Sequence, residues 1–197
     1  MGRKNYAIII LAAGNSKRLG HPKQLVKWGK STLLNNTIAA AKGVLGVDVF
    51  LSLGGHKENI IRSLSSDIDI LLVDDWELGM GNTIAQSVAH VLVKKSYDAI
   101  IISVSDQPHL TSNNFDALIA SHESSNSPIV VSEYISGIGP PTLFSSIHFK
   151  ELTQLSDDSG AKRIIRAHKK TITYVPFPKG DFDIDTDEDL ELLESLK

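Results

Sequence analysis

The strongest constraint on this chain is the alternation of apolar runs with segments of helical periodicity. Six strand-like runs recur, and several are continuously apolar: Tyr6–Ala12, Val47–Leu53, Ile68–Val73, Ala99–Val104, Ile129–Ser132 and Thr171–Val175. Continuous runs are typical of strands that are covered on both faces. Between them, apolar residues recur three and four positions apart around Ile38, Val88 and Leu118. The pattern predicts a three-layer α/β/α fold with a mostly parallel, mixed sheet.

Length and composition favour one globular domain. We find no repeat, low-complexity tract or linker in the 197 residues, so residues 1–197 are predicted to form a single domain. A net charge of -3 argues against nucleic acid or a membrane surface as partner. The lack of cysteine excludes thiolate metal sites and a cysteine nucleophile. The apolar run before Gly14 is too short for a membrane span or signal core, which predicts a cytoplasmic protein.

The loop after the first apolar run combines glycines with cations. The run stops at Gly14, and the loop continues with Arg18, Gly20 and Lys23. Glycine can take positive φ values and lets main-chain N–H groups face a ligand, while arginine and lysine suit phosphate. Most basic loops are only solvated. This loop, however, follows the carboxyl end of a strand, where open α/β sheets bind ligands, so the sequence predicts an anion site.

Asp106 is a candidate ligand for a hard cation. It follows the run Ala99–Val104 and precedes Pro108, so it lies where a buried strand meets a loop. Mg²⁺ takes one or two protein carboxylates together with substrate phosphates. A turn aspartate or a helix cap explains the same residue equally well.

A second acidic candidate lies near the carboxyl end. If the segment is extended, Asp181, Asp183 and Asp185 share one face, and a divalent cation would relieve their repulsion. The alternative is that the carboxylates are solvated and that the following residues cap a short closing helix, predicted over 187–196.

A third candidate segment precedes the helix around Val88. Gly79 and Gly81 allow close approach of the backbone, and Thr83 at a helix start offers both a cap and a ligand hydroxyl. A plain transition from loop to helix is an equal alternative. The seven histidines lack the i, i+4 spacing of a zinc-binding helix, so no histidine metal site is expected.

The glycine loop resembles a known signature. The pattern L-A-A-G-x-S-x-R-x-G-x-P-K is similar to that of nucleotidyltransferases of the molybdenum-cofactor cytidylyltransferase branch, whereas guanylyltransferase relatives read LAGG. The resemblance implies a Rossmann-like nucleotidyltransferase fold and a loop that wraps the base and triphosphate of a nucleotide. By position, these binding roles fall on Leu11, Ala12, Ala13, Gly14, Arg18 and Lys23.

Two acidic motifs extend the resemblance. The D-x-P motif implies that Asp106 binds Mg²⁺, and the D-I-D-T-x-E-D motif implies that Asp185, or secondarily Asp183, completes the site. The G-M-G-x-S/T motif of the family matches Gly79, Gly81 and Thr83 and leads into a helix beside the base.

Two further motifs lie toward the acceptor in the family. Residues 137–144 resemble G-x-P-V-L-F and residues 157–162 resemble G-D-x-G-A-R. Both depart from the pattern, because Thr142 replaces an apolar residue, Asp157 a glycine and Lys162 an arginine.

The resemblance implies nucleotidyl transfer from a nucleoside triphosphate, preferably CTP, to molybdopterin or its molybdenum-loaded form. A phosphate of the acceptor would attack the α-phosphorus, with Mg²⁺ on Asp106 and Asp185 neutralising charge. Arg18 and Lys23 would stabilise the departing pyrophosphate. The product would pass to a molybdenum hydroxylase. Transfer to a sugar phosphate, or cofactor delivery without turnover, are the alternatives.

Overall fold

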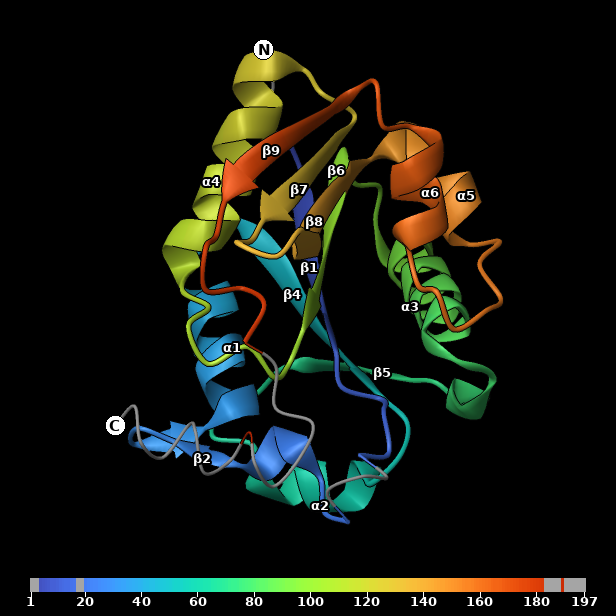
Figure 1. Ribbon diagram of the computed structural model, residues 1–197. Coiled ribbons are helices and arrows are strands. Elements are labelled where there is room, and N and C mark those ends of the chain that lie inside the picture. The colour runs from blue at the N-terminus through green and yellow to red at the C-terminus, as the bar shows by residue number, and fades with distance from the viewer. Residues whose placement is uncertain (1–3, 17–19, 183–188, 190–197) are drawn as a thin grey trace.

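The structure, a computed structural model, describes residues 4–16, 20–182 and 189 (Figure 1). A seven-stranded sheet forms its centre. The strands are β1 (Tyr6–Leu11), β4 (Val47–Leu53), β5 (Asp69–Leu72), β6 (Ala99–Val104), β7 (Ile129–Glu133), β8 (Ile138–Ser145) and β9 (Ile172–Pro176). Their order is β5-β4-β1-β6-β8-β7-β9, and β8 alone runs antiparallel to its neighbours within this described sheet. A ribbon of β2 (Lys27–Trp28) and β3 (Ser31–Thr32) stands apart from it.

Helices cover both faces of the sheet. The α-helices are α1 (Leu33–Lys42), α2 (Lys57–Ser63), α3 (Met80–Lys94), α4 (Ser112–Ser125), α5 (Phe149–Leu152) and α6 (Lys162–Ala167). Short 3-10 turns form η1 (Lys23–Leu25), η2 (Trp76–Leu78) and η3 (Ser146–His148). Figure 1 shows α1 and α4 on one side of the sheet and α3, α5 and α6 on the other. None of the described helices is both long and apolar enough to cross a membrane.

Two apolar cores form, one on each face of the sheet, and β1 contributes side chains to both. Ile8 and Ile10 pack in the core of α1, α2 and α4, whereas Ile9 packs in the core of α3, α5 and α6. All three side chains are fully buried. This confirms the predicted three-layer α/β/α fold with a mostly parallel, mixed sheet, because only a strand covered on both faces can bury every successive side chain.

The six predicted strands all form, with ends within one residue of the prediction. The sequence does not predict β8, because Pro140 and Pro141 suggest a loop. The register explains how the strand accommodates them: Val131 pairs with Thr142 and Ser132 with Gly139, so a bulge leaves both prolines outside the ladder. The predicted closing helix over 187–196 lies outside the described residues except for residue 189.

Burial of α4 against the sheet provides a test of the fold. Phe115 is fully buried, and we expect Phe115→Ala to lower the free energy of unfolding by about 3–5 kcal/mol through lost burial and a residual cavity. Val93 is 88% exposed, so Val93→Ala should change it by less than about 0.5 kcal/mol. Urea denaturation measures both, and equal effects would contradict the assigned burial.

Candidate functional site

Parallel pairing brings two predicted site residues together. β1 and β6 are neighbours, with Leu11 opposite Val104, so the loops that follow them emerge at the same edge of the sheet. The Lys23 Nζ atom lies 2.5 Å from the Asp106 Oδ2 atom. A predicted anion-binding cation and a predicted metal ligand therefore form one ion pair, across 83 positions of sequence.

One oxygen atom of the Asp106 carboxylate has no hydrogen-bond partner among the described residues. The residue is only 6% exposed, and its Oδ1 atom is buried without a hydrogen-bond partner among the described residues. Buried carboxylate oxygens are normally paired, so an unpaired one at the end of a strand suits a cation ligand. Arg18, Asp183 and Asp185 lie outside the described residues, so their predicted roles stay predictions.

The Gln24 side chain fixes the glycine loop by hydrogen bonds. Its buried side-chain amide donates hydrogen bonds to the carbonyl oxygens of Ala12 (3.3 Å) and Gly14 (3.2 Å). The Gly55 N–H donates to the Ala13 carbonyl at 3.0 Å. The loop backbone is thus fixed through its carbonyl groups. The sequence offers no signal for this role of Gln24.

The loop glycines differ from each other. Gly20 has a φ of 66°, a left-handed value that favours glycine, whereas Gly14 is not among the residues with positive φ. A Cβ atom at Gly14 would meet no described atom within 4 Å. The open space beside Gly14 belongs to the cavity described next.

A cavity of about 360 Å³ lies between the glycine loop and the start of α3. Nine of the residues that the resemblance assigns to nucleotide or metal binding lie within the described part of the chain. Eight of these nine line the cavity: Leu11, Ala12, Ala13, Gly14, Lys23, Gly79, Thr83 and Asp106. Trp76 of η2 also lines this cavity, and so does Asp158, which belongs to the segment 157–162 that resembles an acceptor motif. The structure therefore gathers the glycine loop, the basic residue and the carboxylate around one space.

The structure shows which backbone approaches Gly81 and corrects the predicted cap role of Thr83. A Cβ atom at Gly81 would lie 2.5 Å from the Asp157 carbonyl oxygen, to which the Gly81 N–H donates at 2.7 Å. Gly81 therefore permits close packing of another protein segment. Thr83 is not the cap of α3, because Gly79 holds that position and Thr83 donates back to the Gly79 carbonyl at 3.2 Å.

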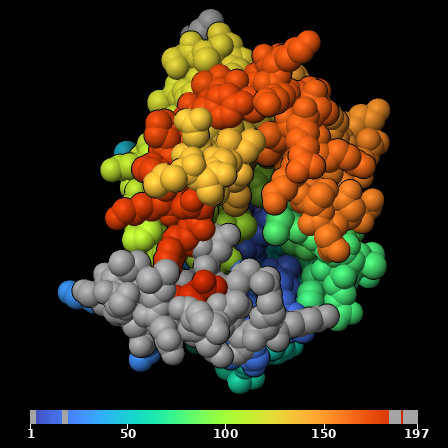
Figure 2. All heavy atoms as spheres, in the orientation of Figure 1, coloured from blue at the N-terminus to red at the C-terminus, as the bar shows by residue number. Residues whose placement is uncertain are grey.

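A second cavity of about 500 Å³ adjoins the first and shares Leu11, Met80 and Val104 with it. Its other walls come from β8 and α6 and include Thr142 and Lys162 of the two predicted acceptor segments. Figure 2 shows the surface hollowed between the amber residues before β8 and the orange residues around α6. Two adjoining cavities therefore lie at one edge of the sheet.

The Gln107 side chain connects three segments of the chain near this edge of the sheet. The sequence gives no signal for this structural role. The Nε2 atom of the buried Gln107 side chain lies within hydrogen-bond distance of three acceptors, which share its two hydrogens: the carbonyl oxygens of Gly180 (2.6 Å) and Pro140 (3.1 Å) and the Tyr134 hydroxyl (2.9 Å). The neighbouring Asp181 lines the second cavity. The acidic run thus begins beside the strand end that carries Asp106.

Near this edge, Asp157 stabilises its own loop. Hydrogen bonds from the hydroxyl and backbone N–H of Ser159 hold the pKa of the Asp157 carboxyl below its ordinary value. The side chain therefore stays ionised and braces the segment whose backbone contacts Gly81.

Comparisons with known proteins identify a family and relatives of this chain. Residues 8–172 match the family described as MobA-like NTP transferase domain. The purine catabolism protein PucB of Bacillus subtilis (strain 168) is 26% identical over 207 residues, with 97% of each chain covered.

Two solved structures extend the similarity. The homologue of Mycobacterium tuberculosis Rv0371c from Mycobacterium sp. strain JC1 superimposes with a TM-score of 0.83 at 33% identity, covering 97% of this chain and 96% of that one. The manganese complex of Rv0371c from Mycobacterium tuberculosis H37Rv has a TM-score of 0.77 at 23% identity, covering 97% and 98%.

The ion pair at the cavity predicts unequal effects of removing its partners. Lys23→Met should leave the buried Asp106 carboxylate unpaired and cost about 3 kcal/mol of unfolding free energy, the low end for a buried pair because the Lys23 side chain is 22% exposed. Asp106→Asn removes the charge that needs a partner and should cost less than about 1 kcal/mol. Chemical denaturation of both variants measures this, and a larger loss for Asp106→Asn would show that the lysine is the dependent partner.

Proposed function

The chain belongs to the MobA-like NTP transferase family and is a nucleotidyltransferase, and from this premise we propose that it transfers a cytidylyl group from CTP to molybdopterin or its molybdenum-loaded form, releasing pyrophosphate. The observation that carries the proposal is the Lys23–Asp106 pair at the wall of the glycine-loop cavity, with Asp106 Oδ1 left without a partner among the described residues. We further propose that the 197 residues work as one domain.

Lys23 and Arg18 bind the triphosphate in this proposal. Lys23 belongs to η1, directly behind the glycine loop, and its backbone N–H donates to the Ser16 hydroxyl at 3.0 Å. This bond holds the start of η1 against the loop, so the lysine is positioned before the nucleotide arrives. When the pyrophosphate leaves, both cations stabilise its growing negative charge, and no protein nucleophile is required.

Asp106 would hold Mg²⁺ together with Asp185 or, secondarily, Asp183. The ion supplies charge neutralisation at the phosphates when it is bound. Gln107 supports this assignment, since its bond to the Gly180 carbonyl anchors the residue that precedes Asp181, where the acidic run begins. The manganese complex of the mycobacterial relative supports a divalent metal in the family.

The acceptor occupies the second cavity in this proposal. Lys162 and Arg166 from α6 line it and provide positive charge for a phosphate group. A phosphate is ionised at neutral pH, so its oxygen can attack the α-phosphorus with little help from a general base. The acceptor phosphate then attacks from the second cavity. The pyrophosphate leaves on the side of the glycine-loop cavity, as in-line displacement requires.

Pyrophosphate release tests this function. The purified protein should release pyrophosphate from CTP only when Mg²⁺ and molybdopterin are both present, and Asp106→Asn should lower turnover by about a thousandfold or more. Lys23→Ala and Arg18→Ala should weaken CTP binding whatever the acceptor.

The other outcomes of this assay are informative. Turnover with a sugar phosphate but not with molybdopterin would replace the acceptor, and tight molybdopterin binding without any turnover would indicate a delivery protein. Activity of Asp106→Asn within a few-fold of the natural chain would remove the metal assignment.

The choice of base gives a further prediction. Ala13 is buried and lines the nucleotide cavity at a position where guanine-using relatives carry glycine, so its methyl group crowds a purine more than a pyrimidine. We expect kcat/KM for CTP to exceed that for GTP by at least about tenfold, and Ala13→Gly to narrow the gap. Steady-state assays with both nucleotides measure this. A preference for GTP would exclude cytidylyl transfer while leaving nucleotidyl transfer in place.

A further inference from the structure

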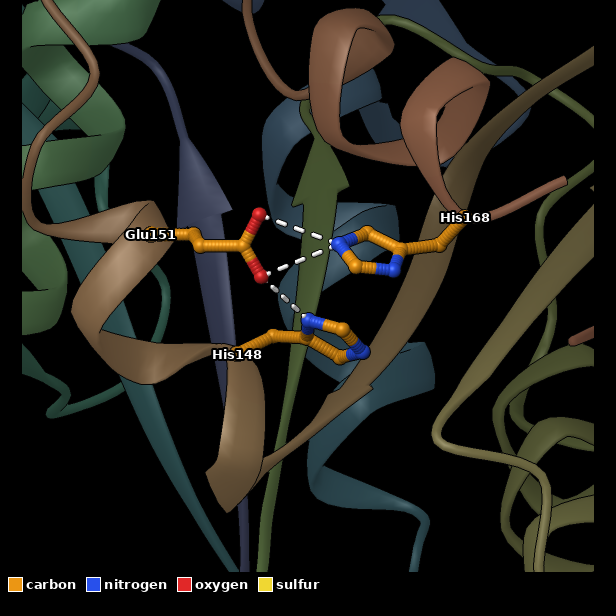
Figure 3. Close-up of side chains that lie close together, drawn as sticks. All are labelled: His148, Glu151 and His168. Atoms are coloured by element: carbon orange, nitrogen blue, oxygen red, sulfur yellow. Dashed lines mark hydrogen bonds and ion pairs between the residues drawn. The ribbon is translucent and has the colours of Figure 1, made fainter.

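Three metal-ligating side chains converge at a place that the proposed reaction does not use. His148 ends η3, Glu151 belongs to α5, and His168 follows α6. The Glu151 carboxylate lies 2.7 Å from His148 Nδ1 and 3.0 Å from His168 Nε2 (Figure 3). One ligand atom from each residue lies within 4.8 Å of the others. The imidazole rings are close neighbours, with centroids 4.5 Å apart.

The cluster is remote from the nucleotide cavity. The Ser146 N–H, two residues before His148, donates to the carbonyl of Asp98, which precedes β6. Asp106 follows the opposite end of the same strand. A strand of six residues spans about 20 Å, so the two sites lie at opposite ends of β6.

We propose that His148, Glu151 and His168 bind one divalent transition-metal ion of the Zn²⁺ type. Two imidazole nitrogens and one carboxylate oxygen suit zinc and its neighbours better than Mg²⁺, which prefers oxygen ligands. Three protein ligands leave a coordination position for water. His168 and Glu151 are partly exposed, which gives the ion a path from solvent.

Metal binding would require a shift of the three side chains. Around a four-coordinate zinc ion with bonds of about 2.0–2.1 Å, ligand atoms lie about 3.3 Å apart. The separations of 2.7 and 3.0 Å would therefore widen by about 0.6 and 0.3 Å. The two ligand nitrogens, which lie within 4.8 Å of each other, would adopt the same spacing. The ion replaces the two ring hydrogens that point at Glu151, and each hydrogen moves to the other nitrogen of its ring.

Burial of His148 limits the affinity. Its Nε2 atom is buried and has no partner among the described residues, so the hydrogen that moves there finds no acceptor. Absence of such a second contact weakens metal binding by about 10–100-fold compared with a fully supported site. The site should therefore bind zinc more weakly than a structural zinc finger does.

The ion would join α5 to the end of α6. Because α6 contributes Lys162 and Arg166 to the second cavity, binding at His168 would fix the helix that lines it. This effect appears as stability, since a ligand that binds only the folded chain raises its melting temperature.

Metal titration of the full chain tests the site. In excess Mg²⁺, Co²⁺ should produce visible absorption that saturates at one ion per chain, Zn²⁺ should displace it, and Zn²⁺ should raise the melting temperature. His168→Gln and Glu151→Gln, which alter partly exposed side chains, should each weaken Co²⁺ binding at least about tenfold and abolish the thermal shift.

Two controls separate this site from others. His90→Gln changes an exposed histidine outside the cluster and should leave the Co²⁺ titration unchanged. Asp106→Asn should also leave it unchanged, because that carboxylate belongs to the nucleotide cavity. Absence of stoichiometric Co²⁺ binding, or binding that persists unaltered in His168→Gln and Glu151→Gln, would overturn the proposal.

Discussion

The parallel pairing of β1 with β6 is the constraint on which the candidate site depends. Because Leu11 lies opposite Val104, the glycine loop and the Asp106 turn leave the sheet side by side. The Lys23–Asp106 ion pair follows from that register, since a slip of one residue would turn every side chain of the strand to the other face. The apolar cores on both faces maintain the register, so burial of β1 also orders the glycine loop that follows it.

Two buried polar side chains next to the site fix the positions of the loops that follow the strands. Gln24 holds the glycine loop by its carbonyl groups, and Gln107 joins the end of β6 to the segment after β9. Each amide donates to backbone carbonyl groups of a neighbouring segment. The packing of Gly81 against Asp157 adds a third link, between α3 and the loop that leads into α6. The loops that line the cavities are therefore held in place through their backbone groups.

Local patterns predicted most of the central sheet. Continuous apolar runs identify β1, β4 and β6, because strands buried on both faces need apolar residues at every position. The same reasoning fails for β8, where two prolines resemble a loop and only a bulge against β7 accommodates them. Helices as short as α5 and α6 contain too few turns to show a period.

The sequence by itself determined the layered fold and identified half of the residues around the glycine-loop cavity, because strand burial and the glycine-loop pattern are local properties of the chain. Only the tertiary structure decided which distant residues meet. It paired Lys23 with Asp106, gave Gly81 a packing role, and brought His148 beside His168 although their spacing matches no helical zinc pattern. Such contacts depend on the register and packing of separate elements, and no periodicity within one segment records them.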